Sequence, residues 1–384
     1  MTEFDPDTLS FTPFDAAPAR LIIRPQAVVE NWQRMQKLSG KARAAAVVKA
    51  DAYGLGAEEI VPALYDAGCR DFFVAVPDEG MLAREVAPDA RIFVLSGVWP
   101  GTEAQFFDYD LVPVLASEDQ VAFWTNAVSQ SGEHPCALMV DTGMNRLGLS
   151  VDEAIALAND PTRPASFSPV LLLSHLACGD EPEHPLTRQQ LESFQKVAAV
   201  YEGIESSLSN SAGITLGADY HFDLTRPGIS LYGGSTGNPD FKPGASVVTA
   251  EARIVQLRDI KAGEGVSYGA TFRPTRDTRL AVVAAGYADG FHRSLSGSGV
   301  PLRQAVQQGA MGFVNGHRVP LAGRITMDLT IFDVTDVPDG DIRVGDYIEL
   351  IGENILLDDV AKAAGTIGYE LLTGLGNRYQ RIYV

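Results

Sequence analysis

A long alternation of short apolar runs and amphipathic segments over residues 44–232 constrains the fold of this chain more than any other feature. The apolar runs have the length of buried strands, and the segments between them carry apolar residues at helical spacing. The amphipathic segments lie at 57–67, 118–129, 151–159 and 186–201, and the apolar runs end near Lys49, Val76, Leu95, Leu115, Asp141, His175, Ser209 and Tyr232. Eight strands that alternate with helices predict an α/β chain with a closed, TIM-type (β/α)8 barrel.

An open, doubly wound sheet is the second architecture that this alternation allows. No G-x-G-x-x-G turn follows the first apolar run, which disfavours a sheet of the dinucleotide-binding kind. Ahead of the alternation, residues 20–24 are expected to form a short strand and residues 26–38 a helix with apolar side chains at helical spacing. We therefore predict a barrel domain over residues 15–240.

The pattern changes after Gly233-Gly234. Glycine and proline are concentrated in residues 237–244, which we expect to form a linker. Segments rich in β-forming residues follow at 247–257, 279–286, 311–314, 329–334 and 347–351, and one short helix is expected at 357–364. This composition predicts a mostly-β C-terminal domain over residues 241–384, with residues 1–14 joined to it.

Charge and composition argue against several classes of function. The 384-residue chain has a formal net charge of −19 and no run rich in Lys or Arg, which disfavours nucleic-acid binding. Cys69, Cys136 and Cys178 are too few and too far apart for a disulfide framework or a zinc site, so no metal is predicted. The acidic start lacks the apolar core of a secretory signal, and no apolar run is long enough to span a membrane. We expect a cytoplasmic protein.

Lys49 lies at the exit of the first buried run, directly after Val47-Val48. Lysine is rarely buried without a partner, so its position needs a reason. A solvated strand end is one explanation. The other is a desolvated amine, whose lowered pKa makes it nucleophilic enough for Schiff-base chemistry. This stretch alone leaves both interpretations open.

Other polar residues follow the predicted strands, where a parallel barrel carries its catalytic groups. The small residues of 209–213 are suited to holding an anion with backbone N–H groups, although they could equally form an ordinary helix N-cap. His175 could be structural, and Arg146 could pair with Asp141. Together the candidates place an amine, cations and an anion cradle at one rim: Lys49, Arg146, His175, Asn210, Ser211 and Arg226.

The segments that carry these residues resemble motifs of the alanine racemase family. Ala46-Val47-Val48-Lys49-Ala50-Asp51-Ala52-Tyr53-Gly54 is similar to the pyridoxal-phosphate signature of that family. Further similar segments follow in the same order at 141–148, 174–177, 209–213, 226–233, 266–271, 286–290 and 323–328, and Tyr369 lies in the sequence Ile-Gly-Tyr-Glu. Because the matches extend over both predicted domains, they favour the Schiff-base interpretation of Lys49.

The resemblance implies a fold-type III pyridoxal 5'-phosphate enzyme that interconverts L- and D-alanine as a head-to-tail homodimer with shared active sites. In such an enzyme Lys49 and Tyr268 would be the two catalytic bases, and Tyr268 would reach into the site of the partner chain. Arg146 and the backbone N–H of Met327, again from the partner, would hold the substrate carboxylate. The cofactor contacts implied by the resemblance are Lys49, Tyr53, His175, Asn210, Ser211, Arg226, Gly228, Ile229 and Tyr369.

Two positions depart from the family pattern. Leu55 stands where many relatives have a histidine, outside the proposed chemistry. Met139 stands where some relatives carry a carbamylated lysine that steadies the carboxylate-binding arginine. Since methionine cannot be carbamylated, Arg146 would need another support, for which Asn145, Asp141 and a bound anion are the candidates.

Three other functions stay open at this stage. A racemase of broader specificity, acting on serine for example, would differ only in the walls of its pocket, which discriminate by about 1–3 kcal/mol per methylene. A decarboxylase of the same fold type is disfavoured by the contexts of Tyr268 and Arg226. A non-catalytic pyridoxal-phosphate-binding protein would be a single barrel, whereas Tyr268 and Met327 lie in the second predicted domain.

Overall fold

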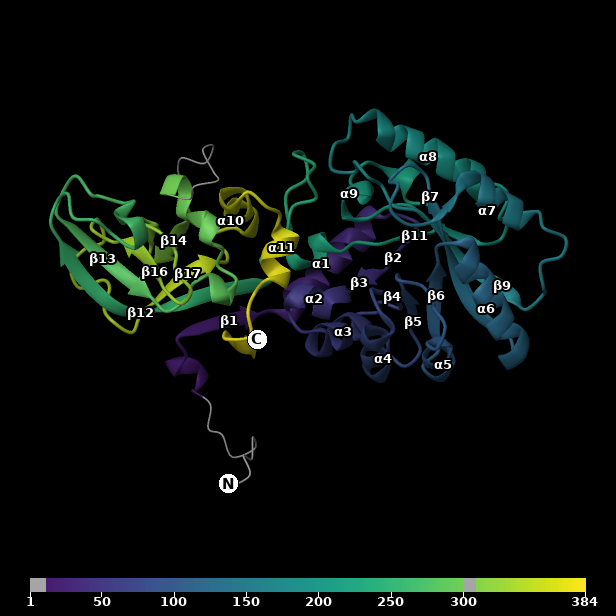
Figure 1. Ribbon diagram of the computed structural model, residues 1–384, viewed down its shortest axis with the longest axis horizontal. Helices are drawn as coiled ribbons and strands as arrows, with labels where there is room; N and C mark the ends of the chain where they lie inside the picture. Colours follow the sequence, from purple (N-terminus) through teal and green to yellow (C-terminus); the bar gives the residue numbers. More distant parts are fainter. Residues whose placement is uncertain (1–11, 300–308) are drawn as a thin grey trace, which may run out of the picture. The chain divides into compact units, whose positions relative to one another are not determined.

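The computed structural model describes residues 12–299 and 309–384, and the chain divides into two compact units (Figure 1). One unit is Pro25–Ala245, and the other combines the segment up to Arg24 with Ser246–Val384. The boundaries expected from the sequence, after residues 14 and 240, lie ten and five residues earlier. Residues 1–11, which were expected to join the mostly-β domain, lie outside the described residues.

Backbone pairing explains why the segment before Arg24 belongs with the second unit. The expected strand at 20–24 forms as β1 (Ala19–Ile23). It pairs antiparallel with β12 (Val248–Ile260) and parallel with β18 (Gln380–Tyr383), so both of its edges are covered by strands of that unit.

Parallel strands form the centre of the Pro25–Ala245 unit (Figure 1). Their order around the sheet is β10 (Glu205–Ser207), β9 (Phe167–Leu173), β7 (His134–Asp141), β6 (Leu111–Leu115), β5 (Arg91–Val94), β4 (Asp71–Val74) and β3 (Ala46–Val47), and the short β8 (Leu149–Ser150) pairs beside β7. All the pairings in this sheet are parallel. The parallel sheet predicted from the alternation is therefore confirmed.

The ring closes through β11 (Leu224–Thr225). On one edge, β11 pairs with β2 (Arg43–Ala44), and the N–H of Ala45 between β2 and β3 donates to the Thr225 carbonyl at 2.9 Å. On the other edge, the Asp223 N–H donates to Ser206 at 3.0 Å and the Arg226 N–H to Ser209 at 2.8 Å, next to β10. With β2 and β3 counted as one strand, these bonds complete the eight-stranded barrel that the sequence predicted.

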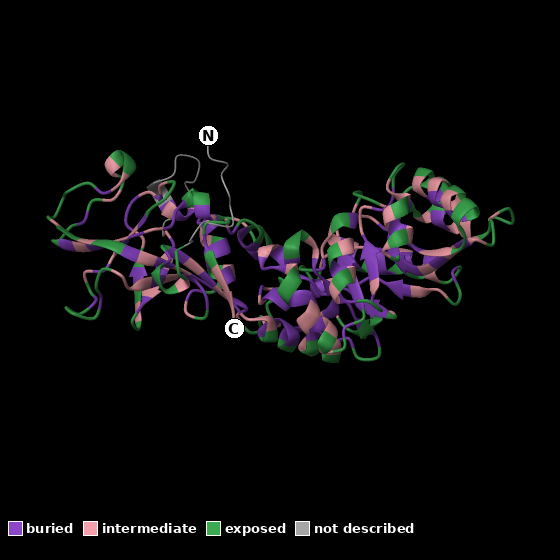
Figure 2. Ribbon diagram, turned by 90° about the horizontal axis from the view of Figure 1, so that it is seen from below, coloured by how far each residue is buried: buried purple, intermediate pink, exposed green. Residues whose placement is uncertain are grey.

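Helices surround the barrel strands and bury their apolar faces against them, as the coloring by burial shows (Figure 2). The helices expected from the sequence are confirmed as α1 (Pro25–Leu38), α3 (Ala57–Asp66), α6 (Glu118–Ser131), α7 (Val151–Ala158) and α8 (Pro185–Ala198). The structure adds α4 (Pro77–Val86), α5 (Glu103–Asp108) and the short α9 (Ser211–Ile214). Among the described residues, no helix combines the length and the apolar character needed to cross a membrane.

The eighth strand differs from its prediction. The apolar run that ends near Tyr232 was expected to form it, but Ile229–Tyr232 is a 3-10 helix, η4, and the strand is Leu224–Thr225. Helix α1 packs against η4, and the Tyr232 hydroxyl donates to the Val47 carbonyl at 3.0 Å. Apolar character alone does not separate a short buried helical turn from a buried strand, which explains the error.

The second unit is mostly β, as predicted. Its main sheet has the order β15 (His317–Pro320), β14 (Met311–Val314), β17 (Tyr347–Ile351), β12, β1, β18, and β13 (Thr278–Val283) pairs with β12 and β16 (Thr330–Asp333). The helix expected at 357–364 is α10 (Leu357–Ala364), and α11 (Gly368–Thr373) follows it. Strands β15 and β18 were not predicted because four residues with mixed polarity give no clear period-2 pattern.

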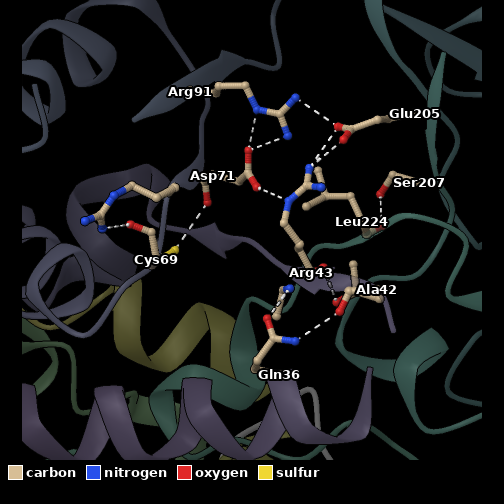
Figure 3. Close-up of polar contacts among 12 residues, drawn as sticks. Gln36, Ala42, Arg43, Cys69, Asp71, Arg91, Glu205, Ser207 and Leu224 are labelled. Atoms are coloured by element: carbon tan, nitrogen blue, oxygen red, sulfur yellow. Dashed lines mark hydrogen bonds and ion pairs between the residues drawn. The ribbon is translucent and has the colours of Figure 1, made fainter. Parts of the chain in front are cut away.

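An ion-pair cluster crosses the N-terminal end of the barrel (Figure 3). Arg91 donates to Asp71 at 2.6 Å and to Glu205 at 2.9 Å, and Arg43 donates to the same two carboxylates at 3.2 and 2.9 Å. The Asp71 side chain is only 5% exposed. Burial opposes the ionisation of Glu205, but hydrogen bonds and charge from both arginines outweigh it and lower the pKa of Glu205. The cluster links β2, β4, β5 and β10 and so spans the closure at β11.

Replacing Asp71 with asparagine should destabilise the barrel, because the buried partner shared by Arg43 and Arg91 loses its charge. Breaking a buried pair costs about 3–5 kcal/mol, and we expect about 2–3 kcal/mol here because both arginines reach solvent. The apparent melting temperature should fall by about 5–10 °C. Tryptophan fluorescence during heating measures it, since all three tryptophans of the chain lie in the Pro25–Ala245 unit.

Asp66→Asn is the matched control for this substitution. It removes the same charge from an exposed position at the end of α3 and should leave the melting temperature nearly unchanged. Equal melting temperatures for Asp71→Asn and the control would show that the ion-pair cluster does not stabilise the barrel.

Candidate active site

The residues singled out in the first domain lie on loops at the C-terminal ends of barrel strands. Lys49 follows β3, Arg146 follows β7, His175 follows β9, Asn210 and Ser211 follow β10, and Arg226 follows β11. Because all these strands are parallel, their C-terminal ends meet at one rim. The charges of Arg226, Arg146 and Lys49 all act on the His175 imidazole, which shows that the structure brings these four side chains together.

The turn after β3 has an unusual backbone. The element α2 (Lys49–Gly54) begins at Lys49, and residues 50–53 have φ values of 54°, 54°, 51° and 58°, in the left-handed region. A left-handed turn of non-glycine residues costs about 1–2 kcal/mol per residue, so it must be held from outside. At its C-terminal end the Asp51 carboxylate accepts the Ala57 N–H at 2.7 Å. Leu55, the first departure from the family pattern, is fully buried.

The amine of Lys49 is made more basic by one neighbour and less basic by its other surroundings. Burial lowers the pKa of Lys49, and the charge of Arg146 lowers it further, whereas the charge of Glu79 raises it. The net effect is a lowered pKa, which increases the neutral, nucleophilic fraction of the amine at neutral pH. Lys49 therefore has the surroundings that covalent attachment of a carbonyl compound requires.

Arg226 is a buried cation held by neutral groups. One terminal nitrogen donates to the Ser207 hydroxyl, and the other donates to the carbonyls of Ser174 and Leu208. Burial lowers the pKa of Arg226 to about 9, so the guanidinium stays charged at neutral pH. Within the described part of the chain the Nε–H of Arg226 makes no hydrogen bond, and this donor is therefore left for a ligand with an acceptor atom.

His175 is neutral in this site. Burial, followed by the charges of Arg226, Arg146 and Lys49, lowers the pKa of His175 to about 3. Its Nε2 lies 3.4 Å from the amide nitrogen of Asn210, which can only donate, so Nε2 accepts and the proton belongs on Nδ1. The fully buried Gln190 of α8 donates to the His175 carbonyl at 2.9 Å and accepts the Ala177 N–H at 2.8 Å. Gln190 thereby fixes the loop that carries the imidazole.

Hydrogen-bond donors are concentrated around Ser211. Its hydroxyl oxygen accepts the Gly228 N–H at 2.8 Å, the Ser230 N–H at 3.3 Å and the Ser230 hydroxyl at 3.0 Å. A hydroxyl oxygen has two lone pairs, so three donors exceed what it can fully satisfy. A Cβ on Gly228 would overlap the Tyr53 hydroxyl, which shows how closely Tyr53 approaches this backbone. The arrangement suits an anion with several acceptor oxygens, such as a phosphate.

The neighbouring anion-cradle residue, Asn210, also has an ordinary structural role. Its side chain accepts the Gly213 N–H at 2.9 Å and so caps α9. The N-cap interpretation of segment 209–213 therefore describes Asn210, whereas the donors around Ser211 come from Gly228 and Ser230, outside that segment. That the segment itself holds an anion stays a prediction.

Asp141 holds the loop that carries Arg146. Its carboxylate accepts the backbone N–H groups of Gly143 at 2.8 Å, of Asn145 at 3.1 Å and of Arg146 at 3.1 Å. Over the ranges that the structure describes, the exposed Arg146 guanidinium forms no hydrogen bond or ion pair, including with Asp141. Met139 is buried. Asp141 thus supports the Arg146 backbone and leaves its guanidinium available for a carboxylate ligand.

Three residues predicted for the site lie in the second unit. Tyr268 opens the short helix η5 (Tyr268–Ala270) and is 70% exposed, and Met327 is 53% exposed. Their loops contact each other, because the Ser267 hydroxyl donates to the Arg324 carbonyl at 2.6 Å. Tyr369 lies on α11 and is also exposed. Two accessible side chains are therefore presented by adjoining loops of this unit.

Sequence reasoning missed the side chains that support the site. Glu79, Gln190, Ser207 and Ser230 act through hydrogen bonds to residues distant in the sequence. Glu79 is one of two acids in the first turn of a helix. Acids are common there because they interact favourably with the helix N-terminus. No local pattern could have distinguished these residues from surface or core positions.

Comparison with known proteins gives one family over nearly the whole chain. Residues 23–236 match the family model of the alanine racemase N-terminal domain, and residues 247–383 match that of the alanine racemase C-terminal domain. The chain is 63% identical over 371 residues to the biosynthetic alanine racemase of Agrobacterium fabrum, covering 97% of this chain and 95% of that one. It is 60% identical to an alanine racemase of Rhizobium meliloti, covering 97% and 98%.

A solved structure has the same fold. The crystal structure of alanine racemase from Bartonella henselae, with covalently bound pyridoxal phosphate, superimposes with a TM-score of 0.87 at 38% sequence identity. The alignment covers 96% of this chain and 100% of that one. The barrel and the mostly-β unit are thus both shared with that structure.

The neutral state of His175 should make the stability of the barrel depend on pH. Between about pH 6.5 and 3 the unfolded imidazole binds a proton that the folded imidazole does not, so stability falls as the pH is lowered through this window. The contribution reaches a slope of about 1.4 kcal/mol per pH unit. His175→Gln should therefore give a flatter dependence when the cofactor-free protein is unfolded in urea between pH 4.5 and 6.5 and followed by tryptophan fluorescence.

The matched control is His317→Gln, which removes a partly exposed imidazole from the second unit and should keep the wild-type slope. A His175→Gln protein with the same pH slope as wild type would mean that His175 is protonated in the folded barrel well above pH 3.

Proposed function

Since this chain belongs to the alanine racemase family, we propose that Lys49 and Tyr268 move the α-proton of alanine in its active site. The chain is a pyridoxal-phosphate-dependent racemase that interconverts L- and D-alanine. The observation that best supports the role of Lys49 is the lowered pKa of its amine at the barrel rim, which follows from burial and from the charge of Arg146.

The residues at the rim fit the cofactor. The surplus of donors around Ser211, with the adjoining backbone of Gly228 and Ile229, would hold the phosphate. Tyr53, which approaches Gly228 closely, and Asn210 would lie at the same end, and Tyr369 stays a predicted phosphate contact. When bound, pyridoxal phosphate disperses the electron pair that remains on the α-carbon after the proton is removed.

The other end of the cofactor would meet Arg226 and His175. The Nε–H of Arg226, which is not used in the described part of the chain, would donate to the pyridine nitrogen. A guanidinium that stays protonated leaves that nitrogen as an acceptor. The neutral imidazole of His175 would lie against the ring without adding a further positive charge.

Racemisation needs one group on each face of the α-carbon. The group on one face takes the proton, and the group on the other face returns one. Lys49 would act on the D-isomer and Tyr268 on the L-isomer. A lysine at its ordinary pKa of about 10.4 is almost fully protonated at neutral pH, so the lowered pKa of Lys49 supports its role as a base. Arg146 and the backbone N–H of Met327 would hold the substrate carboxylate and so fix the α-carbon between the two bases.

We propose further that the protein is a homodimer in which each site is completed by Tyr268 and Met327 of the partner chain. The high exposure of both side chains, on adjoining loops, supports this arrangement. The cytoplasm remains our proposal for the location. The three cysteines are free thiols, as is usual in a reducing compartment.

Lys49→Ala should abolish racemisation, with a loss of at least about 10²–10⁴-fold, because it removes a catalytic base together with the covalent attachment of the cofactor. The purified wild-type protein should be yellow, should lose that colour on borohydride reduction, and should form D-alanine from L-alanine. Lys37→Ala, at an exposed position on α1, is the control and should behave as wild type. A Lys49→Ala protein that still produces D-alanine at the wild-type rate would contradict the assignment.

Mixing inactive Lys49→Ala and Tyr268→Phe chains should restore activity. If sites are shared, each mixed dimer has one site with both bases and one with neither, so random exchange in an equal mixture gives about a quarter of the wild-type rate. Size-tagged chains show whether mixed dimers have formed. Mixed dimers that stay inactive would place both bases of a site on the same chain.

A further inference from the structure

Glu79 joins the ends of two neighbouring barrel strands. It lies in the first turn of α4, and its Oε1 accepts the Ala50 N–H at 2.7 Å while Oε2 accepts the Ala75 N–H at 2.8 Å. Ala50 follows Lys49 at the end of β3, and Ala75 follows β4 directly. Hydrogen bonds to a carboxylate are shorter and stronger than neutral ones, so both oxygens fix this corner of the rim.

The turn that Glu79 holds needs such support. Residues 50–53 stay left-handed without a glycine, and each adds to the cost of the turn. Asp51 anchors the C-terminal end of the turn through Ala57, and Glu79 anchors its N-terminal end through Ala50. The anchored N–H belongs to Ala50, the residue after Lys49. Loss of this hydrogen bond would therefore change the backbone conformation next to Lys49 and with it the direction of the lysine side chain.

The other acid in the same helical turn behaves differently. Asp78 is exposed and, among the residues that the structure describes, makes no hydrogen bond or ion pair. Its place is explained by the favourable interaction of any acid with a helix N-terminus. That explanation is not sufficient for Glu79, which is partly buried and whose two carboxylate oxygens accept backbone N–H groups from two different loops.

We propose that Glu79 is a positioning residue for Lys49, which it orients for attachment of the cofactor by anchoring the left-handed turn at Ala50. The proposal rests on the role of Lys49 given above. The carboxylate of Glu79 bonds to the backbone N–H groups of Ala50 and Ala75 and is not assigned a contact with the reacting atoms. It acts through the backbone of the residue that follows the lysine.

Glu79 also acts on Lys49 through its charge. The charged groups that influence the amine are Arg146, which lowers the pKa of Lys49 in addition to burial, and Glu79, which raises it. His175, the other titratable group of the cluster, is neutral above about pH 3. Removing the charge of Glu79 should therefore lower the pKa of Lys49 further.

Glu79→Gln tests both effects, because glutamine keeps the size but replaces one acceptor oxygen with a donor and removes the charge. Bound pyridoxal phosphate should dissociate about tenfold faster, which corresponds to the loss of one hydrogen bond to a charged group. The uptake of added pyridoxal phosphate by the cofactor-free protein requires the neutral amine, so its rate rises with pH. The midpoint of this rise should lie at a lower pH in Glu79→Gln than in wild type. Visible absorption measures both.

Two further variants separate position from charge. Asp78→Asn removes the neighbouring charge and should match wild type in both measurements. Glu79→Asp keeps the charge but shortens the side chain by one methylene, so it should retain a midpoint close to wild type and still lose the cofactor faster. If Glu79→Gln does not fold, as circular dichroism of the cofactor-free protein would show, Glu79→Asp still tests the positioning role.

Wild-type dissociation rates in both Glu79 variants would overturn the proposal. So would a Glu79→Gln protein with lower thermal stability but an unchanged midpoint and dissociation rate, because that result assigns Glu79 to folding alone. A wild-type protein that takes up no pyridoxal phosphate is a different outcome, since it would contradict the proposed role of Lys49 itself and remove the premise of the inference.

Discussion

Closure of the parallel ring at β11 is the constraint on which the rest of the site depends. This strand has only two residues, yet backbone hydrogen bonds on both of its edges join it to β10 and to β2. Arg226 follows β11, Ser211 follows β10, and Lys49 follows the strand continuous with β2. An open sheet would leave the loops of its two edge strands far apart, whereas the closed ring brings the amine, the donor cluster and the buried guanidinium to one rim.

The site accumulates positive charge that the barrel itself does not neutralise. Arg226 is held by hydroxyl and carbonyl oxygens, Arg146 extends from a loop whose carboxylate is occupied by backbone N–H groups, and His175 is kept neutral by burial and by these cations. Burying a cation without an anion is costly, so the buried Arg226 marks a functional site, and the exposed Arg146 adds a cation that an anionic ligand can use. The phosphate of the cofactor and the carboxylate of alanine are the two anions that the family reaction supplies.

The sequence predicted the features that follow from local periodicity and from direct resemblance. The barrel was predicted because apolar runs alternate with amphipathic helical segments, and α10 and most strands of the second unit were predicted from their local composition and spacing. The eighth strand was misplaced onto η4 because Ile229–Tyr232 is a short, buried, mostly apolar run, whereas the strand itself, Leu224–Thr225, has only one apolar residue. The left-handed turn could not be predicted, since residues 50–53 contain no glycine, and its anchor Glu79 is 29 residues from Ala50. Long-range hydrogen bonds to the backbone leave no mark in a single sequence.

The opposing influences on Lys49 have a chemical purpose in a reversible reaction. A strongly lowered pKa would leave the amine unprotonated but make it a weak base, and in the proposed mechanism Lys49 must also return a proton to the α-carbon in the opposite direction. Efficient transfer both ways favours a pKa near the working pH. Burial and Arg146 move the pKa of Lys49 down toward that range, and Glu79 limits how far it falls. The carboxylate that anchors the turn therefore also balances the amine that the turn carries.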